Sequence, residues 1–205
     1  MAAALGADYV GVVLTSGFGR SVGADVAPGL VRDVPSIPVA VLVDEDLDGA
    51  ARAAEALGAG VVQLHGRESP ELAEALRALG PWQVWKAVRV REPSDVTEAL
   101  DRYGAVVDGI LVEGWKEGVV GGGGARADFA VLEQTRRAVS AALTLVLAGG
   151  LTPANVGEGV ARVRPSVVDV SSGVEEVPGR KARVLVQRFI EEARRDPLLP
   201  NGVLR

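Results

Sequence analysis

Short apolar runs rich in β-branched residues alternate along the chain with longer segments in which apolar residues recur every three or four positions. The first pattern predicts strands, and the second predicts amphipathic helices. Because the predicted strands are apolar almost throughout, we expect both of their faces to be buried, as in a parallel sheet. One helix is marked at both ends: Ser69 can cap it, Pro70 suits its first turn and Gly80 ends it. The predicted strands are residues 8–14, 38–43, 60–64, 83–88, 107–112, 143–148 and 166–171.

Alternating strands and helices leave two main α/β architectures, a doubly wound open sheet and a (β/α)₈ TIM barrel. After the first predicted strand, "GFGRSVG" has the spacing G-x-G-x-x-x-G, which does not meet the dinucleotide fingerprint of the open sheet. Glycine-bearing turns with the character of a binding site follow the last two predicted strands, where a barrel places its phosphate site. The pattern favours the barrel, although seven strands are predicted and a closed barrel needs eight. We expect residues 1–195 to form one TIM-barrel domain and residues 196–205 to be a C-terminal tail.

Composition excludes several classes of function. The 205 residues contain no cysteine, which excludes disulfides, a zinc-thiolate site and a cysteine nucleophile or base within them. A net charge of -5 without a basic stripe argues against nucleic acid as a partner. The longest apolar runs fall far short of the ~20 residues that a membrane helix needs. We therefore expect a cytoplasmic protein with no membrane partner and no metal site.

The stretch "LVLAGGLTPANVG" follows the sixth predicted strand. Gly149 and Gly150 let the backbone approach a ligand closely. We expect Thr152 to cap a helix that starts at Pro153, so that the N-terminal amides of the helix point at the same spot.

The stretch "VDVSSGVEEVPGRK" follows the seventh predicted strand. Ser171 and Ser172 offer hydroxyl groups, Gly173 offers an unobstructed amide, and "PGRK" is expected to open the last helix. Either stretch alone is equally consistent with a tight turn between a strand and a helix. Two such turns at adjacent strand ends favour a phosphate cradle and predict a small phosphorylated molecule as ligand.

Four motifs together closely resemble the phosphoribosylanthranilate isomerase family of tryptophan biosynthesis: "QLHG" (63–66), "WKAV" (85–88), "LAGGLTPANV" (147–156) and "DVSSGVEEVPGRK" (169–181). The resemblance implies a (β/α)₈ barrel that catalyses an Amadori rearrangement of N-(5-phosphoribosyl)anthranilate to the 1-deoxyribulose 5-phosphate product. It implies a general acid at the ring oxygen and a general base that removes the proton at C2 of the sugar. No cofactor is implied, because the anthranilate nitrogen supplies the iminium electron sink.

The family's roles are carried over by matching motifs. Arg20 in "FGRSV" matches the arginine that holds the anthranilate carboxylate, although Gly19 replaces the usual proline. Glu113 in "DGILVEGW" matches the general acid, which in the family is an aspartate. His65 matches a histidine that is not the family's base, so a structural or ligand-lining role is implied. The implied phosphate-binding residues are Gly149, Gly150, Ser172 and Gly173.

The implied base is the largest departure. In the family it is a cysteine in a K-x-C-G motif on the first strand, and the 205 residues contain neither. The opening "AAALGADYVGVVL" resembles the end of the first helix followed by the second strand, so we expect the first strand to be missing. The glycine-rich loop at 121–124 also departs from the family's G-G-T-G.

Three interpretations stay open. The natural chain could begin upstream and be the isomerase. It could instead be a catalytically impaired paralogue that binds a phosphorylated sugar or anthranilate-like ligand without turnover. In the third interpretation, the chain is an isomerase in which Glu113 or His65 serves as the general base and another sugar phosphate is the substrate. The sequence leaves the oligomeric state undecided, and a homodimer is one option.

Overall fold

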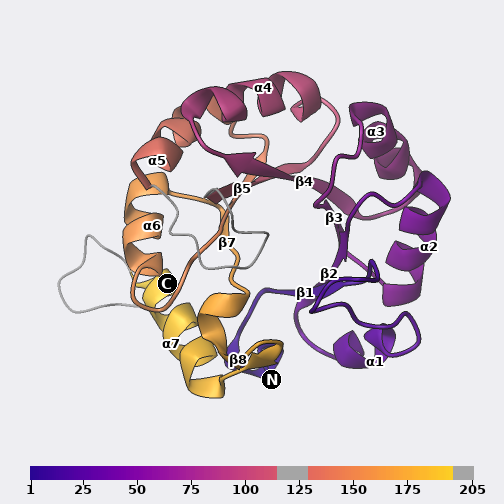
Figure 1. Cartoon of the computed structure of the whole chain (residues 1–205), viewed down its shortest axis with the longest axis horizontal. Helices are drawn as coiled ribbons and strands as arrows, with labels where there is room; N and C mark the ends of the chain where they lie inside the picture. The colour runs from indigo at the N-terminus through magenta and orange to yellow at the C-terminus, as the bar shows by residue number, and fades with distance from the viewer. Residues whose placement is uncertain (115–128, 196–205) are drawn as a thin grey trace. The chain divides into compact units, whose positions relative to one another are not determined.

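A computed structural model describes residues 1–114 and 129–195 (Figure 1). The glycine run at 121–124 and the predicted tail at 196–205 therefore lie outside the described residues. The chain divides into two compact units: unit 1 comprises residues 1–87 and 99–110, and unit 2 comprises residues 88–98 and 111–205.

Seven strands form the main sheet in the described part of the chain, in the order β1-β2-β3-β4-β5-β6-β7. The pairs β1–β2, β2–β3, β3–β4 and β6–β7 are all parallel. The seven predicted strands and their parallel arrangement in these pairs are thus confirmed. The strands are β1 (Tyr9–Val13), β2 (Ile37–Leu42), β3 (Val61–Leu64), β4 (Gln83–Val90), β5 (Gly109–Gly114), β6 (Thr144–Ala148) and β7 (Val167–Val168).

The last of these strands is much shorter than the predicted 166–171. Ser166 donates its backbone N–H to the carbonyl oxygen of Leu145, and Asp169 donates to that of Leu147. The chain then leaves the sheet for a short 3₁₀ turn, η2 (Ser172–Val174). The apolar run therefore predicted too long a strand, because the second half of the run leaves the sheet.

Burial on both faces is confirmed for β3, in which all four residues are buried. It is wrong for β1, where Gly11 is exposed. β1 stands at the end of the strand order, and besides β2 it has only a single bridge, between Val13 and Ser21, in the described residues. Position in the sheet, and not the apolar sequence alone, sets the burial of a strand.

The helices of unit 1 follow their strands closely. A 3₁₀ turn, η1, precedes β1 and ends at Gly6 in the left-handed region (φ 92°), as expected for a glycine that stops a helix. Helix α3 begins and ends as predicted: the Ser69 hydroxyl accepts from the Leu72 N–H, and Pro70 is the first helical residue. Figure 1 shows α1, α2 and α3 along one side of β1 to β3. The bounds are η1 (Ala3–Leu5), α1 (Ala27–Val31), α2 (Leu47–Leu57), α3 (Pro70–Leu79) and α4 (Pro93–Tyr103), whose first half belongs to unit 2.

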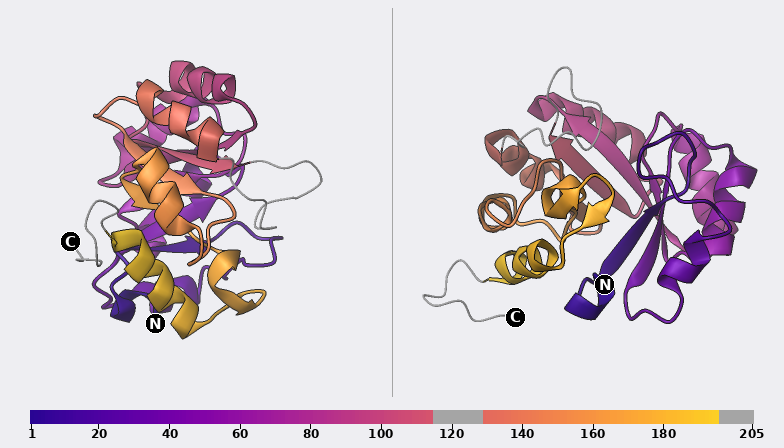
Figure 2. Two further views of the ribbon diagram at one scale, coloured as in Figure 1. Left: turned by 90° about the vertical axis from the view of Figure 1, so that its left-hand side faces the viewer. Right: turned by 60° about the horizontal axis from the view of Figure 1, so that its bottom comes forward.

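In the described part of unit 2, α5 (Phe129–Ala138), α6 (Val156–Val163) and α7 (Arg183–Arg194) pack in chain order. Figure 2 shows them side by side. A two-stranded antiparallel hairpin, β8 (Glu175–Val177) and β9 (Arg180–Lys181), precedes α7. The expectation that "PGRK" opens the last helix is therefore wrong. Gly179 adopts φ 84° in the hairpin turn, a conformation that favours glycine, and α7 begins only at Arg183.

Two leucines of α3 test the packing of this helix directly. Leu76 is fully buried and Leu79 is 55% exposed, on the same helix. We expect Leu76→Ala to lower the free energy of unfolding by about 2–5 kcal/mol, because it removes buried methyl groups and leaves a cavity. Leu79→Ala is the matched control and should change it by no more than about 0.5 kcal/mol. Urea unfolding of both variants checks this, and equal losses would contradict the packing described.

Candidate functional site at the strand ends

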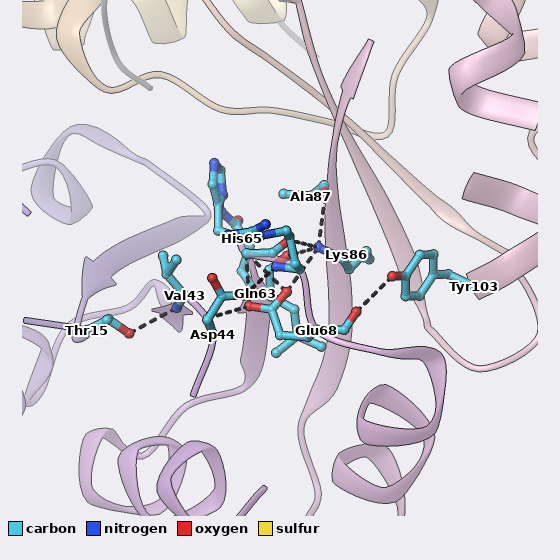
Figure 3. Close-up of polar contacts among 12 residues, drawn as sticks. Thr15, Val43, Asp44, Gln63, His65, Glu68, Lys86, Ala87 and Tyr103 are labelled. Carbon is cyan, nitrogen blue, oxygen red and sulfur yellow. Dashed lines mark hydrogen bonds and ion pairs between the residues drawn. The ribbon is translucent and has the colours of Figure 1, made fainter. Parts of the chain in front are cut away.

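A buried ion pair in unit 1 joins Glu68, in the loop after β3, to Lys86, in the middle of β4 (Figure 3). The Lys86 Nζ is 3.1 Å from Oε2 of Glu68, and the two side chains are only 4% and 1% exposed. Lys86 also donates to the carbonyl oxygens of Leu64, Gly66 and Ala87 at 2.8–3.1 Å. An ion pair buried this deeply loses the hydration of both charges, so it persists only where hydrogen bonds replace the lost water. These carbonyls supply that replacement for the ammonium group.

The carboxylate of Glu68 ties two loops together. Its Oε1 accepts from the N–H groups of Asp44 and Gly66 at 3.0 and 2.9 Å. The Asp44 carboxylate in turn accepts from the Arg67 N–H. A Cβ at position 66 would lie 2.3 Å from Oδ1 and 2.7 Å from the backbone nitrogen of Asp44, so only glycine fits there. The loops after β2 and β3 are therefore locked to each other.

Tyr103 closes this cluster from α4. Its hydroxyl donates to the Glu68 carbonyl oxygen at 2.8 Å, and the Lys86 Nζ lies 5.7 Å from its ring centroid, within cation–π range. Burial lowers the pKa of Lys86, and the neighbouring Glu68 opposes that shift. Burial also raises the pKa of Tyr103. Lys86 thus connects Glu68 with the backbone of Leu64 and Gly66 and fixes the loop after β3.

Sequence reasoning quoted Lys86 only as part of a motif and did not single out Glu68. One signal was present, because a lysine in the apolar run "QVWKAV" of a strand buried on both faces needs a partner. Nothing in the sequence identified that partner as Glu68.

His65 directly follows β3, and its Nδ1 lies 2.9 Å from Nε2 of Gln63. Arg20 lies in the loop after β1 and is half-buried. That loop folds back on its own strand, since Val22 donates to the Val13 carbonyl and the Ser21 hydroxyl donates to that of Thr15. Both predicted residues therefore follow the carboxyl ends of strands in unit 1.

In unit 2 the structure brings the predicted acid and a predicted phosphate-turn residue together. Glu113 is in β5, and a Cβ added at Gly149 would lie 2.8 Å from its Cγ and 2.8 Å from the Gly114 nitrogen. Gly149 and Gly150 both have positive φ, 85° and 63°. Two independent reasons thus require glycine at position 149: its backbone conformation and the close approach of β5.

The turn after β6 is held by a side chain that sequence reasoning did not single out. Asn155 is 7% exposed, donates to the Gly150 carbonyl oxygen at 3.0 Å and accepts from the Thr152 N–H at 2.7 Å. Helix α6 consequently begins at Val156. The prediction that the helix starts at Pro153 is wrong, because Asn155 folds these residues into a turn first. Thr152 does accept hydrogen bonds there: its hydroxyl accepts from the Ala154 N–H at 3.2 Å, and its carbonyl oxygen from the Val156 N–H at 3.0 Å.

The turns after β6 and β7 touch at Gly173. A Cβ there would lie 1.8 Å from the Leu151 carbonyl oxygen, which no side chain can tolerate. Gly173 and Ser172 form the start of η2. Beside them, Lys181 donates to the carbonyl oxygen of Ser171 at 2.8 Å and pairs with Glu175 at 2.9 Å. The predicted phosphate residues after the two strands are thus neighbours.

Metal binding and membrane spanning can both be assessed in the described residues. Residues 1–114 and 129–195 contain no group of three or more histidine, aspartate or glutamate side chains placed to hold a metal ion. None of the helices in these ranges is long and apolar enough to cross a membrane.

Comparison with known proteins matches this arrangement to one family. The family model described as "PRAI: N-(5'phosphoribosyl)anthranilate (PRA) isomerase" matches residues 1–192. A curated relative from Geobacter sp. (strain M21), named N-(5'-phosphoribosyl)anthranilate isomerase, is 40% identical over 95% of this chain and 91% of its own. The relative of the same name from Rubrobacter xylanophilus is 36% identical over 95% and 92%.

Solved structures agree. Phosphoribosyl anthranilate isomerase from Thermotoga maritima has a TM-score of 0.84 and 32% identity, covering 94% of this chain and 90% of that one. Monomers generated from the dimeric enzyme of that organism give 0.81 and 33% over the same shares. A complex of such an isomerase with reduced 1-(o-carboxyphenylamino)-1-deoxyribulose 5-phosphate gives 0.80 and 31%, again over 94% and 90%. The predicted fold class, the (β/α)₈ TIM barrel, is confirmed by these neighbours. The chain belongs to the N-(5'-phosphoribosyl)anthranilate isomerase family.

Proposed function

We propose that this chain is a phosphoribosylanthranilate isomerase, which rearranges N-(5-phosphoribosyl)anthranilate to the 1-deoxyribulose 5-phosphate product in tryptophan biosynthesis. Its similarity to isomerases of that name over 95% of its length supports the reaction. The observation that carries the proposal is the close contact of the turns after β6 and β7. Gly173 packs against Leu151 so tightly that only glycine fits. Such a contact keeps two phosphate-binding turns adjacent.

The residue roles are proposals too. Gly149, Gly150, Ser172 and Gly173 bind the substrate phosphate, Arg20 binds the anthranilate carboxylate through its planar guanidinium, and His65 lines the ligand. Glu113 is the general acid at the ring oxygen. Each of them lies in or just after a strand's carboxyl-terminal part or in the turn that follows, where (β/α)₈ barrels carry their active sites.

The second candidate is a protein that binds the same class of ligand without turning it over. One observation favours it: Glu113 stands where the family resemblance implies a shorter aspartate as the general acid. A misplacement of about an ångström at the reacting atoms can cost ~10²-fold in rate. A homodimer and a cytoplasmic location also stand as proposals; the dimeric Thermotoga maritima enzyme among the structural relatives supports the first.

The two candidates separate in one pair of measurements on the full-length natural protein. Isomerisation is followed by the loss of substrate fluorescence, and binding of reduced 1-(o-carboxyphenylamino)-1-deoxyribulose 5-phosphate is followed by calorimetry. An isomerase turns over the substrate and binds the analogue, whereas the impaired paralogue only binds it. A chain that does neither refutes both candidates.

Removal of the proposed acid should act on the chemical step. We expect Glu113→Gln to lower kcat by about 10²- to 10⁴-fold, because the amide cannot donate the proton to the ring oxygen. Affinity for the reduced analogue should change little. Glu74→Gln, an exposed glutamate of α3, is the control and should keep the parent kcat. A kcat for Glu113→Gln within twofold of the parent would exclude Glu113 as the acid.

The phosphate cradle is tested at Gly173. Gly173→Ala forces a Cβ against the Leu151 carbonyl oxygen and must push the two turns apart. We expect affinity for the reduced analogue to fall at least about tenfold, the equivalent of one good hydrogen bond. Gly157→Ala in α6 is the control, since its Cβ would meet only the Glu192 carbonyl oxygen at an ordinary 3.7 Å. Equal affinities for the two variants would place the phosphate elsewhere.

A further inference from the structure

Trp85, Gln63 and His65 form a hydrogen-bonded chain in unit 1. Trp85 and Gln63 are register partners across the parallel pair β3–β4. The Trp85 Nε1–H donates to Oε1 of Gln63 at 3.1 Å, and Nε2 of Gln63 lies 2.9 Å from Nδ1 of His65. Trp85 and Gln63 are 2% and 6% exposed. This chain of contacts connects His65 to two buried side chains of β3 and β4.

The direction of these bonds is fixed by chemistry. An indole N–H can only donate, so the atom of Gln63 that faces it must be the carbonyl oxygen. The other end of the amide is then an NH₂ group, which can only donate, so Nδ1 of His65 must accept. A neutral imidazole that accepts at Nδ1 carries its proton on Nε2. The alternative amide orientation would set the NH₂ group of Gln63 against the N–H of Trp85.

The backbone that carries His65 is fixed as well. Lys86 donates to the carbonyl oxygens of Leu64 and Gly66, which are the residues on either side of His65 (Figure 3). Glu68 accepts from the Gly66 N–H. Trp85 is further packed against Tyr9, with ring centroids 5.2 Å apart. The imidazole is thus held by its own chain and by Gln63 together.

We propose that Trp85 and Gln63 are positioning residues that fix His65 as the Nε2–H tautomer, so that its outer nitrogen is a hydrogen-bond donor. A donor suits an anionic or carbonyl oxygen of a bound sugar phosphate or carboxylate. It does not suit the removal of a proton from C2, because Nε2 already carries one. The statement about the ligand rests on the proposed function, whereas the tautomer does not.

The tautomer is measurable without ambiguity, because His65 is the only histidine in the sequence. In protein labelled with ¹⁵N-histidine, long-range ¹H–¹⁵N correlation spectra distinguish the two ring nitrogens. At about pH 8, where an ordinary histidine is neutral, we expect protonated Nε2 and unprotonated Nδ1 in at least about tenfold excess over the other form. A proton on Nδ1, alone or together with Nε2, overturns the proposal.

Variants test which residues impose the tautomer. Gln63→Glu replaces the donor by a carboxylate, so we expect the proton to appear on Nδ1. Trp85→Phe removes the N–H that orients the amide, so the tautomer preference should fall at least severalfold. Trp82→Phe is the matched control: Trp82 is also buried and its N–H also donates, but to the Leu76 carbonyl oxygen. It should keep the parent tautomer.

Circular dichroism of each variant establishes that it is folded. A folded Gln63→Glu protein that retains the parent tautomer overturns the proposal, as does a loss of preference in Trp82→Phe equal to that in Trp85→Phe. If Trp85→Phe does not fold, the spectra of the parent protein and of Gln63→Glu still test whether His65 is held as the Nε2–H tautomer. All spectra are recorded without substrate, so absence of isomerase activity leaves the tautomer result intact, and the reverse also holds.

Discussion

A single buried ammonium group determines how the strand ends of unit 1 are arranged. Lys86 neutralises Glu68, and the pair is hydrogen-bonded to the loops after β2 and β3 and to the backbone of β4 at once. Removing either partner alone would leave an unpaired charge in the interior, a loss of about 3–5 kcal/mol. The other local features depend on this pair, including the glycine at position 66 and the fixed backbone of His65. A polar cluster of this kind specifies one loop arrangement where apolar packing alone would allow several.

Unit 2 solves a similar problem mainly with backbone contacts, beside one ion pair in which Glu175 is 5% exposed and Lys181 is 34% exposed. Its turns after β6 and β7 are held by close contact of backbone with backbone, at Gly149 against β5 and at Gly173 against Leu151. Asn155 satisfies the polar groups that this contact would otherwise leave unpaired. A site for phosphate needs exposed backbone N–H groups, and bulky side chains there would cover them. Close contacts at glycine therefore fix the turns, and the absence of a side chain leaves their backbone N–H groups uncovered.

Local patterns in the sequence were sufficient for the existence and approximate place of the seven strands and for the ends of α3, because β propensity, capping and helix termination depend on neighbouring residues. They were insufficient where the deciding contact lies elsewhere in the chain. Gly173 could be identified as a turn residue, but the Leu151 carbonyl that requires it could not. The lysine of "QVWKAV" indicated that a partner for its charge must exist, but it did not identify that partner as Glu68. The β8–β9 hairpin was missed although Pro178–Gly179 is a common turn dipeptide, because a helix was expected there.

The arrangement of His65 narrows the question of how this chain could move a proton at C2. In the proposed tautomer, Nδ1 of His65 accepts from Gln63, 2.9 Å away, and Nε2 carries the proton, so neither nitrogen would take the proton from C2. Lys86 is enclosed by Glu68 and three carbonyls, so its ammonium group does not reach a ligand either. Among the interpretations with a recruited base, this leaves Glu113. The proton balance permits it: a carboxyl group that has given its proton to the ring oxygen is a carboxylate, and a carboxylate can accept the proton from C2.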